Sequence, residues 1–229
     1  MHDAAPVMSA PFRDRLDAGR QLADALASLK LGEPRVVLAL PRGGVPVGHA
    51  IARAVQAVLG VLLVRKLGAP LQPELALGAL ADCGAGMPPH VEWNTALLRT
   101  LAPTQAYLDA VTTQELAEME RRRARYGVTP TPLAGATVIV TDDGVATGAT
   151  VRAALGAVRV ARPARLALAV PVAPDTTWQA LRAEVDDGVC LIAAPDPSFQ
   201  AVGQYYRNFD QTEDSEVIAL LADARQRNH

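Results

Sequence analysis

Short apolar runs recur along the chain, and longer segments with apolar residues at helical spacing separate them. The runs are five to seven residues long, rich in β-branched and aliphatic side chains, and mostly lack the polar alternation of a half-exposed strand. They predict buried strands at residues 35–40, 61–67, 137–141, 165–170 and 188–193.

The intervening segments predict helices. Pro103 and Gly127 flank the longest of them as start and stop signals. Residues 68–90 are rich in Gly and Pro, which favours a long loop with one short strand near residues 75–80. Helices are predicted over residues 13–30, 46–58, 94–100, 103–126, 149–160, 175–185 and 213–226.

Strands that alternate with helices predict an α/β fold with a mostly parallel central sheet flanked by helices. Ligands of such sheets bind at the carboxyl ends of the strands. Three segments directly follow or end predicted strands, namely PRGG (41–44), VRKLG (64–68) and TDDGVATG (141–148). We therefore expect these segments to converge on one rim of the sheet, within a single domain that covers residues 1–229.

Composition narrows the class of protein. The net charge of −2 gives no general attraction to nucleic acid, and the arginines at 121–125 follow acidic residues on one predicted helix, which favours a solvated helix end. No run of 18 apolar residues predicts a membrane span, and the N-terminus lacks the apolar core of a signal peptide. Cys83 and Cys190 are expected to be reduced thiols in a cytoplasmic protein.

The stretch VIVTDDGVATGAT (138–150) carries the most specific chemistry. Two adjacent carboxylates, Asp142 and Asp143, end an apolar run, and each can accept a hydrogen bond from one hydroxyl of a ribose cis-diol. A glycine-containing loop and a predicted helix start follow, and their N–H groups suit an anion. This arrangement predicts a ribose 5′-phosphate ligand, with the phosphate at Gly144, Val145, Ala146, Thr147, Gly148, Ala149 and Thr150.

The same stretch resembles the motif that binds 5-phosphoribosyl pyrophosphate (PRPP) in the type I phosphoribosyltransferases. That motif has an apolar strand, two acidic residues, a short variable stretch and a TG-x-T ending, and all thirteen positions match without a gap. An ordinary strand with an acidic turn and a capped helix is the plainer alternative. A Walker-type phosphate loop fits less well, since no Gly-Lys-Ser/Thr ending is present.

PRGG is the second candidate segment. Gly43 and Gly44 free the backbone to point N–H groups inward, and Arg42 supplies a cationic fork suited to phosphate. In the family that the chain resembles, this position is the pyrophosphate loop, which commonly holds a non-proline cis peptide. The resemblance therefore implies a cis bond between Pro41 and Arg42. An ordinary strand-to-helix turn is the alternative.

VRKLG is the third candidate segment. Arg65 and Lys66, followed by Gly68 and Pro70, resemble the Arg-Lys start of the mobile loop in adenine and orotate phosphoribosyltransferases, a shorter and less specific match. The resemblance implies that Lys66 contacts the departing pyrophosphate and that the loop excludes water. A surface position at a strand end is the plainer alternative for Lys66.

The resemblance implies a reaction as well as a fold. It implies transfer of a 5-phosphoribosyl group from PRPP to a nitrogen nucleophile, expected to be a nucleobase, with release of pyrophosphate. Asp142 and Asp143 would hold the diol and offset the positive charge that develops on the ring. Mg2+ would be held largely by the diol and pyrophosphate oxygens, with no direct protein ligand assigned. No residue is assigned as general base.

The acceptor site is not fixed by these motifs. The family's fold includes a small hood, which the N-terminal helix or residues 194–229 would build here. Residues 198–212 gather aromatic side chains that would either stack on a base or pack the tail onto the core. Ala146 stands where 6-oxopurine salvage enzymes carry a third acidic residue, so hypoxanthine, guanine or xanthine is the less expected acceptor.

Two other functions compete with the transferase. The first is a regulatory protein that senses PRPP or a nucleotide without turnover, because fold alone does not fix function. The second is a hydrolase or phosphatase of phosphorylated sugars, for which neither a positioned water nor a base can be identified. Homo-oligomers are compatible with the sequence, which assigns no interface.

Overall fold

A computed structural model describes residues 11–83, 89–128 and 130–227 of the chain. Five parallel strands form the central sheet in the order β2-β1-β6-β7-β8. Their bounds are β1 (Arg35–Ala39), β2 (Val58–Val61), β6 (Thr137–Thr141), β7 (Arg165–Pro174) and β8 (Asp187–Ala194). The parallel sheet that the apolar runs predicted is therefore confirmed.

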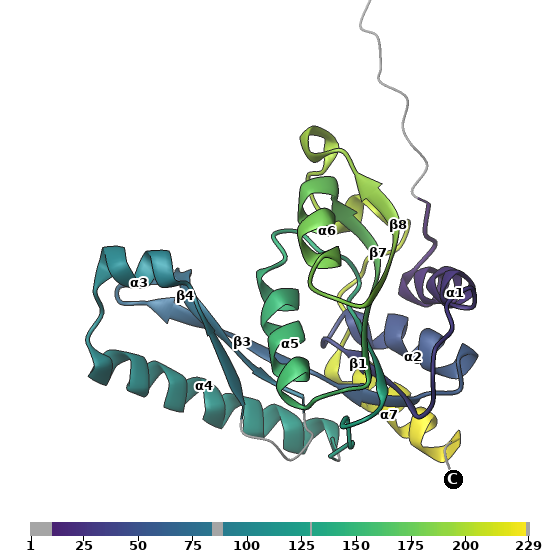
Figure 1. The fold of residues 1–229 in the computed structure, drawn as a ribbon, viewed down its shortest axis with the longest axis horizontal. Coiled ribbons are helices and arrows are strands. Elements are labelled where there is room, and N and C mark those ends of the chain that lie inside the picture. The colour runs from purple at the N-terminus through teal and green to yellow at the C-terminus, as the bar shows by residue number, and fades with distance from the viewer. Residues whose placement is uncertain (1–10, 84–88, 129, 228–229) are drawn as a thin grey trace, which may run out of the picture.

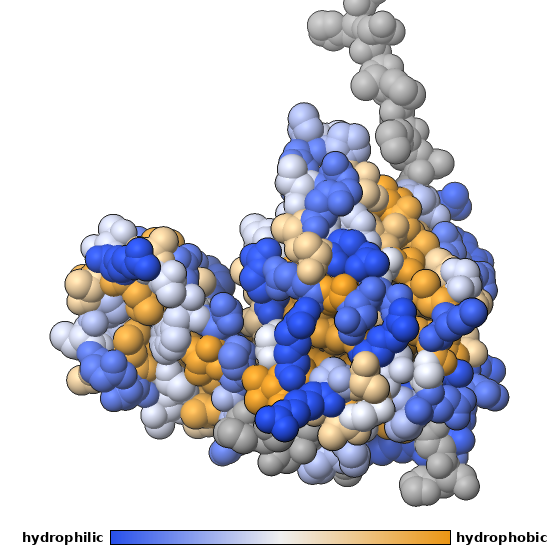
Figure 2. Space-filling view, in the orientation of Figure 1, coloured by the Kyte–Doolittle hydropathy of each residue, from blue (hydrophilic) through white to orange (hydrophobic). Residues whose placement is uncertain are grey.

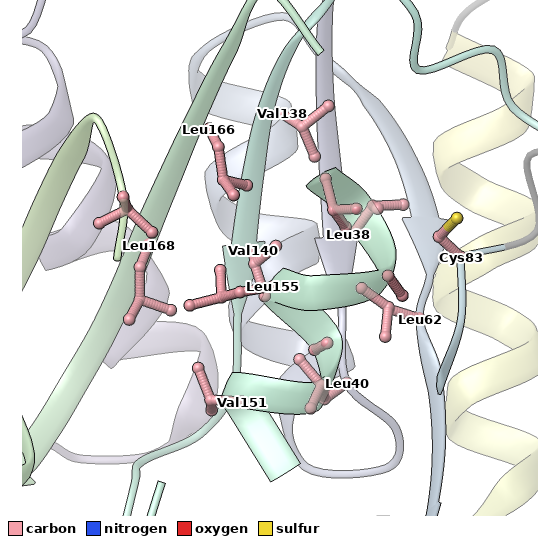
Figure 3. Packing of buried hydrophobic residues seen from close by; sticks show 14 of the residues in the cluster. Leu38, Leu40, Leu62, Cys83, Val138, Val140, Val151, Leu155, Leu166 and Leu168 are labelled. Atoms are coloured by element: carbon pink, nitrogen blue, oxygen red, sulfur yellow. The ribbon is translucent and has the colours of Figure 1, made fainter. Parts of the chain in front are cut away.

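Helices cover both faces of this sheet, as predicted. Alternate strand residues point to opposite faces, so Val36 and Leu38 pack beneath α5, whereas Val37 and Ala39 pack beneath α1, α2 and α7. Figure 3 shows Val151 and Leu155 of α5 lying on the apolar face of the strands. The helices are α1 (Arg15–Leu26), α2 (Gly44–Ala54), α3 (Thr95–Leu101), α4 (Gln105–Tyr126), α5 (Ala149–Val160), α6 (Asp175–Arg182) and α7 (Asp214–Arg227).

A second, antiparallel sheet extends away from the central one and carries α3 and α4 (Figure 1). It contains β3 (Leu63–Ala69), β4 (Gln72–Asp82) and β5 (His90–Trp93). One face packs on α5 of the central body, and the other contacts α4. We call this unit, residues 63–83 and 89–126, the arm.

The arm corrects two predictions. The apolar run 61–67 is not one strand, because it divides at Leu62 between β2 and β3. The loop predicted over residues 68–90 is largely strand, apart from residues 84–88, which lie outside the described residues. Its glycines serve strand geometry: Gly68 sits at a register shift, and a Cβ on Gly78 would lie 2.5 Å from the Glu92 carbonyl oxygen.

The arginine-rich end of α4 was predicted to be a solvated helix end, and its arginines are also ion-paired. Glu118 accepts hydrogen bonds from Arg121 at 2.7 Å and Arg122 at 3.2 Å. Arg125 pairs with Asp214 at 2.6 Å, and Arg123 pairs with Asp82 of the arm. Arg123 and Arg125 therefore tie α4 to β4 and α7, whereas Arg121 and Arg122 pair within the helix.

The outer surface includes one apolar strand edge. β8 ends the central sheet, and its residues 189–192, Val-Cys-Leu-Ile, are half-buried. Figure 2 shows exposed apolar surface in this region, whereas hydrophilic side chains cover much of the surrounding face. None of the described helices is long and apolar enough to cross a membrane.

Candidate functional site

The PRGG segment and the acidic pair meet at one rim of the sheet because β1 and β6 are paired in register. Ala39 lies opposite Thr141, so both strands end at the same level. The Leu40 N–H donates to the Thr141 carbonyl at 3.0 Å, which carries the pairing one residue further. The turn at 41–44 and the pair at 142–143 are therefore side by side, although about a hundred residues separate them in sequence.

The two glycines of PRGG are required by this close approach. A Cβ built on Gly43 would lie 2.0 Å from Asp143 Oδ2, and one built on Gly44 would lie 2.9 Å from Asp142 Cα. Real Cβ atoms essentially never come within 3.0 Å of another group. The predicted convergence of these two segments is confirmed, and the contact between them is direct.

The acidic pair is half-buried, and both carboxyl groups are held by the protein. The Asp143 N–H donates to Asp142 Oδ1 at 2.8 Å, and Arg15 Nε donates to Asp143 Oδ2 at 2.7 Å. One oxygen of each carboxyl group is thereby fixed, and the second oxygen of each is not used by these contacts. Two carboxylate oxygens that can still accept hydrogen bonds are what two ribose hydroxyls require.

Burial and mutual repulsion set the protonation of the pair. Burial, reinforced by the charge of Asp143, raises the pKa of Asp142 well above its usual range. Burial also raises the pKa of Asp143, whereas the hydrogen bond and charge of Arg15 act to lower it. Burial and the neighbouring charge therefore both favour the protonated form of the pair, and Arg15 opposes them.

The loop at 144–148 leads into the N-terminus of α5. Gly148 caps the helix with a left-handed φ of +77°, a conformation that favours glycine, and the Val145 N–H is tied to the Val172 carbonyl at 2.9 Å. Ala146, Thr147, Ala149 and Thr150 are exposed. The first N–H groups of a helix have no intrahelical partner, so this exposed loop and helix start suit a phosphate.

Arg42 lies at the same rim but faces the C-terminal tail. The peptide bond between Pro41 and Arg42 is cis, as the resemblance implied. The Arg42 guanidinium is 4.0 Å from the Glu213 carboxylate and faces the side-chain amide of Gln211. Its side chain is about one-third exposed, at 34%, and both of these contacts are with the tail rather than with the acidic pair.

Arg65 and Lys66 do not follow a parallel strand, which corrects the prediction that VRKLG joins the rim. Both residues lie inside β3 of the arm, since β3 continues to Ala69. Arg65 donates to Glu115 of α4 at 2.6 Å, and Lys66 pairs across the hairpin with Glu74 at 3.1 Å. Neither residue has a contact with the acidic pair or PRGG among the hydrogen bonds and ion pairs of the described chain.

Arg15 is the site residue that sequence reasoning missed. It lies in the first turn of α1, and its Nη1 also donates to the Asp210 carbonyl at 2.6 Å. Its guanidinium carbon lies 4.0 Å from the centre of the Phe209 ring. No local motif marks Arg15, because its partner Asp143 is 128 residues away in sequence.

The aromatic residues of the tail mainly pack it onto the body. Tyr205 and Tyr206 are buried, and they form a cluster with Phe12 at the start of the described chain. The Tyr206 hydroxyl donates to the Asp143 carbonyl at 2.6 Å. Phe209 lies against Tyr206 and Arg15, so packing accounts for these rings at the edge of the site.

Comparison with known proteins identifies the family to which the chain is similar. Residues 14–209 match the family model of the phosphoribosyl transferase domain. A Mycobacterium tuberculosis H37Rv protein, provisionally named phosphoribosyl transferase Rv0571c, is 46% identical over 212 residues. That alignment covers 92% of this chain and 46% of the relative, so the chain spans about half the length of the curated relatives it matches. The crystal structure of TT1426 from Thermus thermophilus is 41% identical, with a TM-score of 0.77 over 93% of this chain and 98% of that one.

Proposed function

The chain belongs to the phosphoribosyl transferase domain family, and from this premise we propose that it transfers the 5-phosphoribosyl group of PRPP to a nitrogen nucleophile. The acceptor is a nucleobase, and pyrophosphate is released. One observation carries the proposal: Gly43 of PRGG lies directly against the Asp143 carboxylate. The segments suited to pyrophosphate, ribose diol and 5′-phosphate thus meet at one rim.

Each segment has a role in this reaction. The bond between ribose C1′ and the pyrophosphate oxygen breaks, and its electron pair leaves with the pyrophosphate. The acceptor nitrogen forms the new bond to C1′ and releases its proton to water. Asp142 and Asp143 hold the diol hydroxyls and offset the positive charge on the ring. The N–H groups of residues 146–150 hold the 5′-phosphate, since the Val145 N–H is committed to the Val172 carbonyl, and Arg42 stabilises the departing pyrophosphate.

The residues at the rim fit Mg2+ chemically. Magnesium prefers oxygen ligands, and the diol that Asp142 and Asp143 would hold brings hydroxyl oxygens there, so neither carboxylate is assigned as a ligand. No group of three or more His, Cys, Asp or Glu suited to a metal occurs in the described part of the chain. The ligands would come from the diol and pyrophosphate oxygens. When bound, the ion would neutralise charge on the pyrophosphate.

A PRPP or nucleotide sensor without turnover is the second candidate. The observation that favours it is the position of Lys66, which pairs with Glu74 in the arm rather than with a rim residue. A sensor needs the diol and phosphate sites but no cation for the leaving group. The two candidates therefore agree on binding and differ on pyrophosphate release.

Calorimetric titration with PRPP and Mg2+ tests the site. We expect binding by the native chain and at least about 100-fold weaker binding by the Asp142→Asn, Asp143→Asn double variant, since two charge-assisted hydrogen bonds are weakened. Asp24→Asn with Asp109→Asn, two exposed aspartates on α1 and α4, is the matched control. Equal affinity in the Asp142/Asp143 variant and its control would refute the site.

A further inference from the structure

Arg15 is held from three sides at the edge of the acidic pair. Its Nε donates to Asp143 Oδ2 at 2.7 Å, its Nη1 donates to the Asp210 carbonyl at 2.6 Å, and Phe209 covers the guanidinium at 4.0 Å. The side chains of Arg15 and Asp143 are only 12% and 17% exposed. Such a shielded, ring-backed ion pair holds a more fixed geometry than a surface pair.

Asp143 is fixed by elements from both ends of the chain. Arg15 comes from α1, whereas the Tyr206 hydroxyl reaches the Asp143 carbonyl from the tail. Gly43 closes the remaining side, because a Cβ built on this glycine would lie only 3.1 Å from Arg15 Nε. The carboxylate therefore has one oxygen committed to Arg15 and little freedom to rotate.

We propose that Arg15 is a positioning residue, which holds the Asp143 carboxylate so that its second oxygen accepts a hydrogen bond from a ribose hydroxyl. This inference rests on the proposed function, because the hydroxyl is that of PRPP. Arg15 acts through Asp143 rather than on the reacting atoms. The tail contributes by holding Arg15 itself, through Asp210 and Phe209.

The physical reason lies in the charges that face Asp143. Asp142 is adjacent and half-buried, Tyr206 is buried beside the pair, and Arg15 is the cation in direct contact. Without Arg15, two neighbouring carboxyl groups would share one proton over a wider pH range. A protonated carboxyl group accepts a ribose hydroxyl less well, so diol binding should require a higher pH.

The test compares Arg15→Gln and Arg15→Lys with Arg20→Gln, a matched control on the same helix whose side chain is 53% exposed. Carboxyl carbon NMR of the free protein follows the titration of Asp142 and Asp143. We expect Arg15→Gln to raise the lower titration midpoint of the pair by about one pH unit or more, because an opposite charge in contact shifts a carboxyl group by that amount. Arg15→Lys should give a smaller rise, and Arg20→Gln none.

PRPP affinity in the presence of Mg2+, measured from about pH 5.5 to about 8.5 in steps of about half a unit, gives the second readout. We expect Arg15→Gln to bind PRPP about tenfold or more weakly than the native chain at the acid end of this range. Its affinity should approach the native value toward the alkaline end, because the acidic pair then ionises at a higher pH than in the native chain. Arg15→Lys should restore part of the affinity. A uniform loss across the whole range, with an unchanged titration, would mean that Arg15 only stabilises the local fold.

Two further results would overturn the proposal: an Arg15→Gln titration and pH profile equal to those of the native chain, or tighter PRPP binding by the variant. If the native chain does not bind PRPP, the proposed function fails, while the carboxyl titration still decides whether Arg15 controls the pair. Should Arg15→Gln not fold, Phe209→Leu removes the ring behind the guanidinium. It should shift the titration in the same direction by a smaller amount.

Discussion

The Gly43→Ala variant should weaken PRPP binding without lowering the stability of the fold. The Gly43 backbone has φ −60° and ψ −33°, which alanine adopts readily, and such a change by itself raises the free energy of unfolding by about 0.4–1 kcal/mol. The new Cβ, however, would lie 2.0 Å from Asp143 Oδ2 and 2.5 Å from Asp143 Cγ. Ordinary van der Waals contact begins at 3.4 Å, so the carboxylate has to withdraw by about 1.4 Å.

That displacement breaks the geometry that diol binding needs. A charge-assisted hydrogen bond contributes about 1.5–3 kcal/mol, so its loss weakens PRPP binding by about 10- to 100-fold. Calorimetry with PRPP and Mg2+ measures this loss, and urea unfolding measures the stability of the same sample. Gly32→Ala is the matched control, because its new Cβ would meet only Thr137 Oγ1, at an ordinary van der Waals distance of 3.5 Å. Native affinity in Gly43→Ala would refute the reasoning, as would an affinity loss that only follows a loss of stability.

Three further predictions concern stability. Arg13 lowers the pKa of Asp17 to about 2, so the pair stabilises the fold above about pH 4, and this contribution is lost as the pH falls toward 2. In urea unfolding, Asp17→Asn should therefore lower the free energy of unfolding by about 1 kcal/mol at about pH 6, after allowance for solvent screening, and by about nothing at about pH 2. A difference that stays constant with pH would contradict this prediction. Leu71 is fully exposed with φ +62° at the tip of the β3–β4 hairpin, so Leu71→Asn should raise the free energy of unfolding by about 0.5 kcal/mol, and a lower melting temperature would count against it. Leu155 is completely buried between α5 and the sheet, so Leu155→Ala should cost about 3 kcal/mol in urea unfolding, whereas a cost below about 1 kcal/mol would mean that the core closes around the change.

The central sheet and the meeting of PRGG with the acidic pair were predictable from the sequence. Strands buried on both faces give continuous apolar runs, and parallel strands bring their carboxyl ends to one rim. The register of β1 with β6 then places Gly43 against Asp143. The predicted sheet and the predicted meeting of PRGG with the acidic pair agree with the structure because they depend only on local sequence pattern and on a general rule of sheet topology.

The arm and Arg15 were not predictable in the same way. The glycines and prolines of residues 68–90 predict a loop by local pattern, whereas Gly68 and Gly78 serve a register shift and a close strand approach, which depend on the partner strand. VRKLG was placed at the rim because the preceding apolar run was expected to stay in the parallel sheet. Arg15 contacts Asp143 only through the tertiary fold, and no spacing rule links residues 128 positions apart.

Pyrophosphate release from PRPP, measured with Mg2+ and one nucleobase at a time, tests the central claim most directly. We predict release with at least one base by the native chain, little or none by the Asp142→Asn, Asp143→Asn variant, and native rates in the Asp24→Asn, Asp109→Asn control. No release with any base, from a sample that binds PRPP with a native acidic pair, would contradict the transferase and favour the sensor.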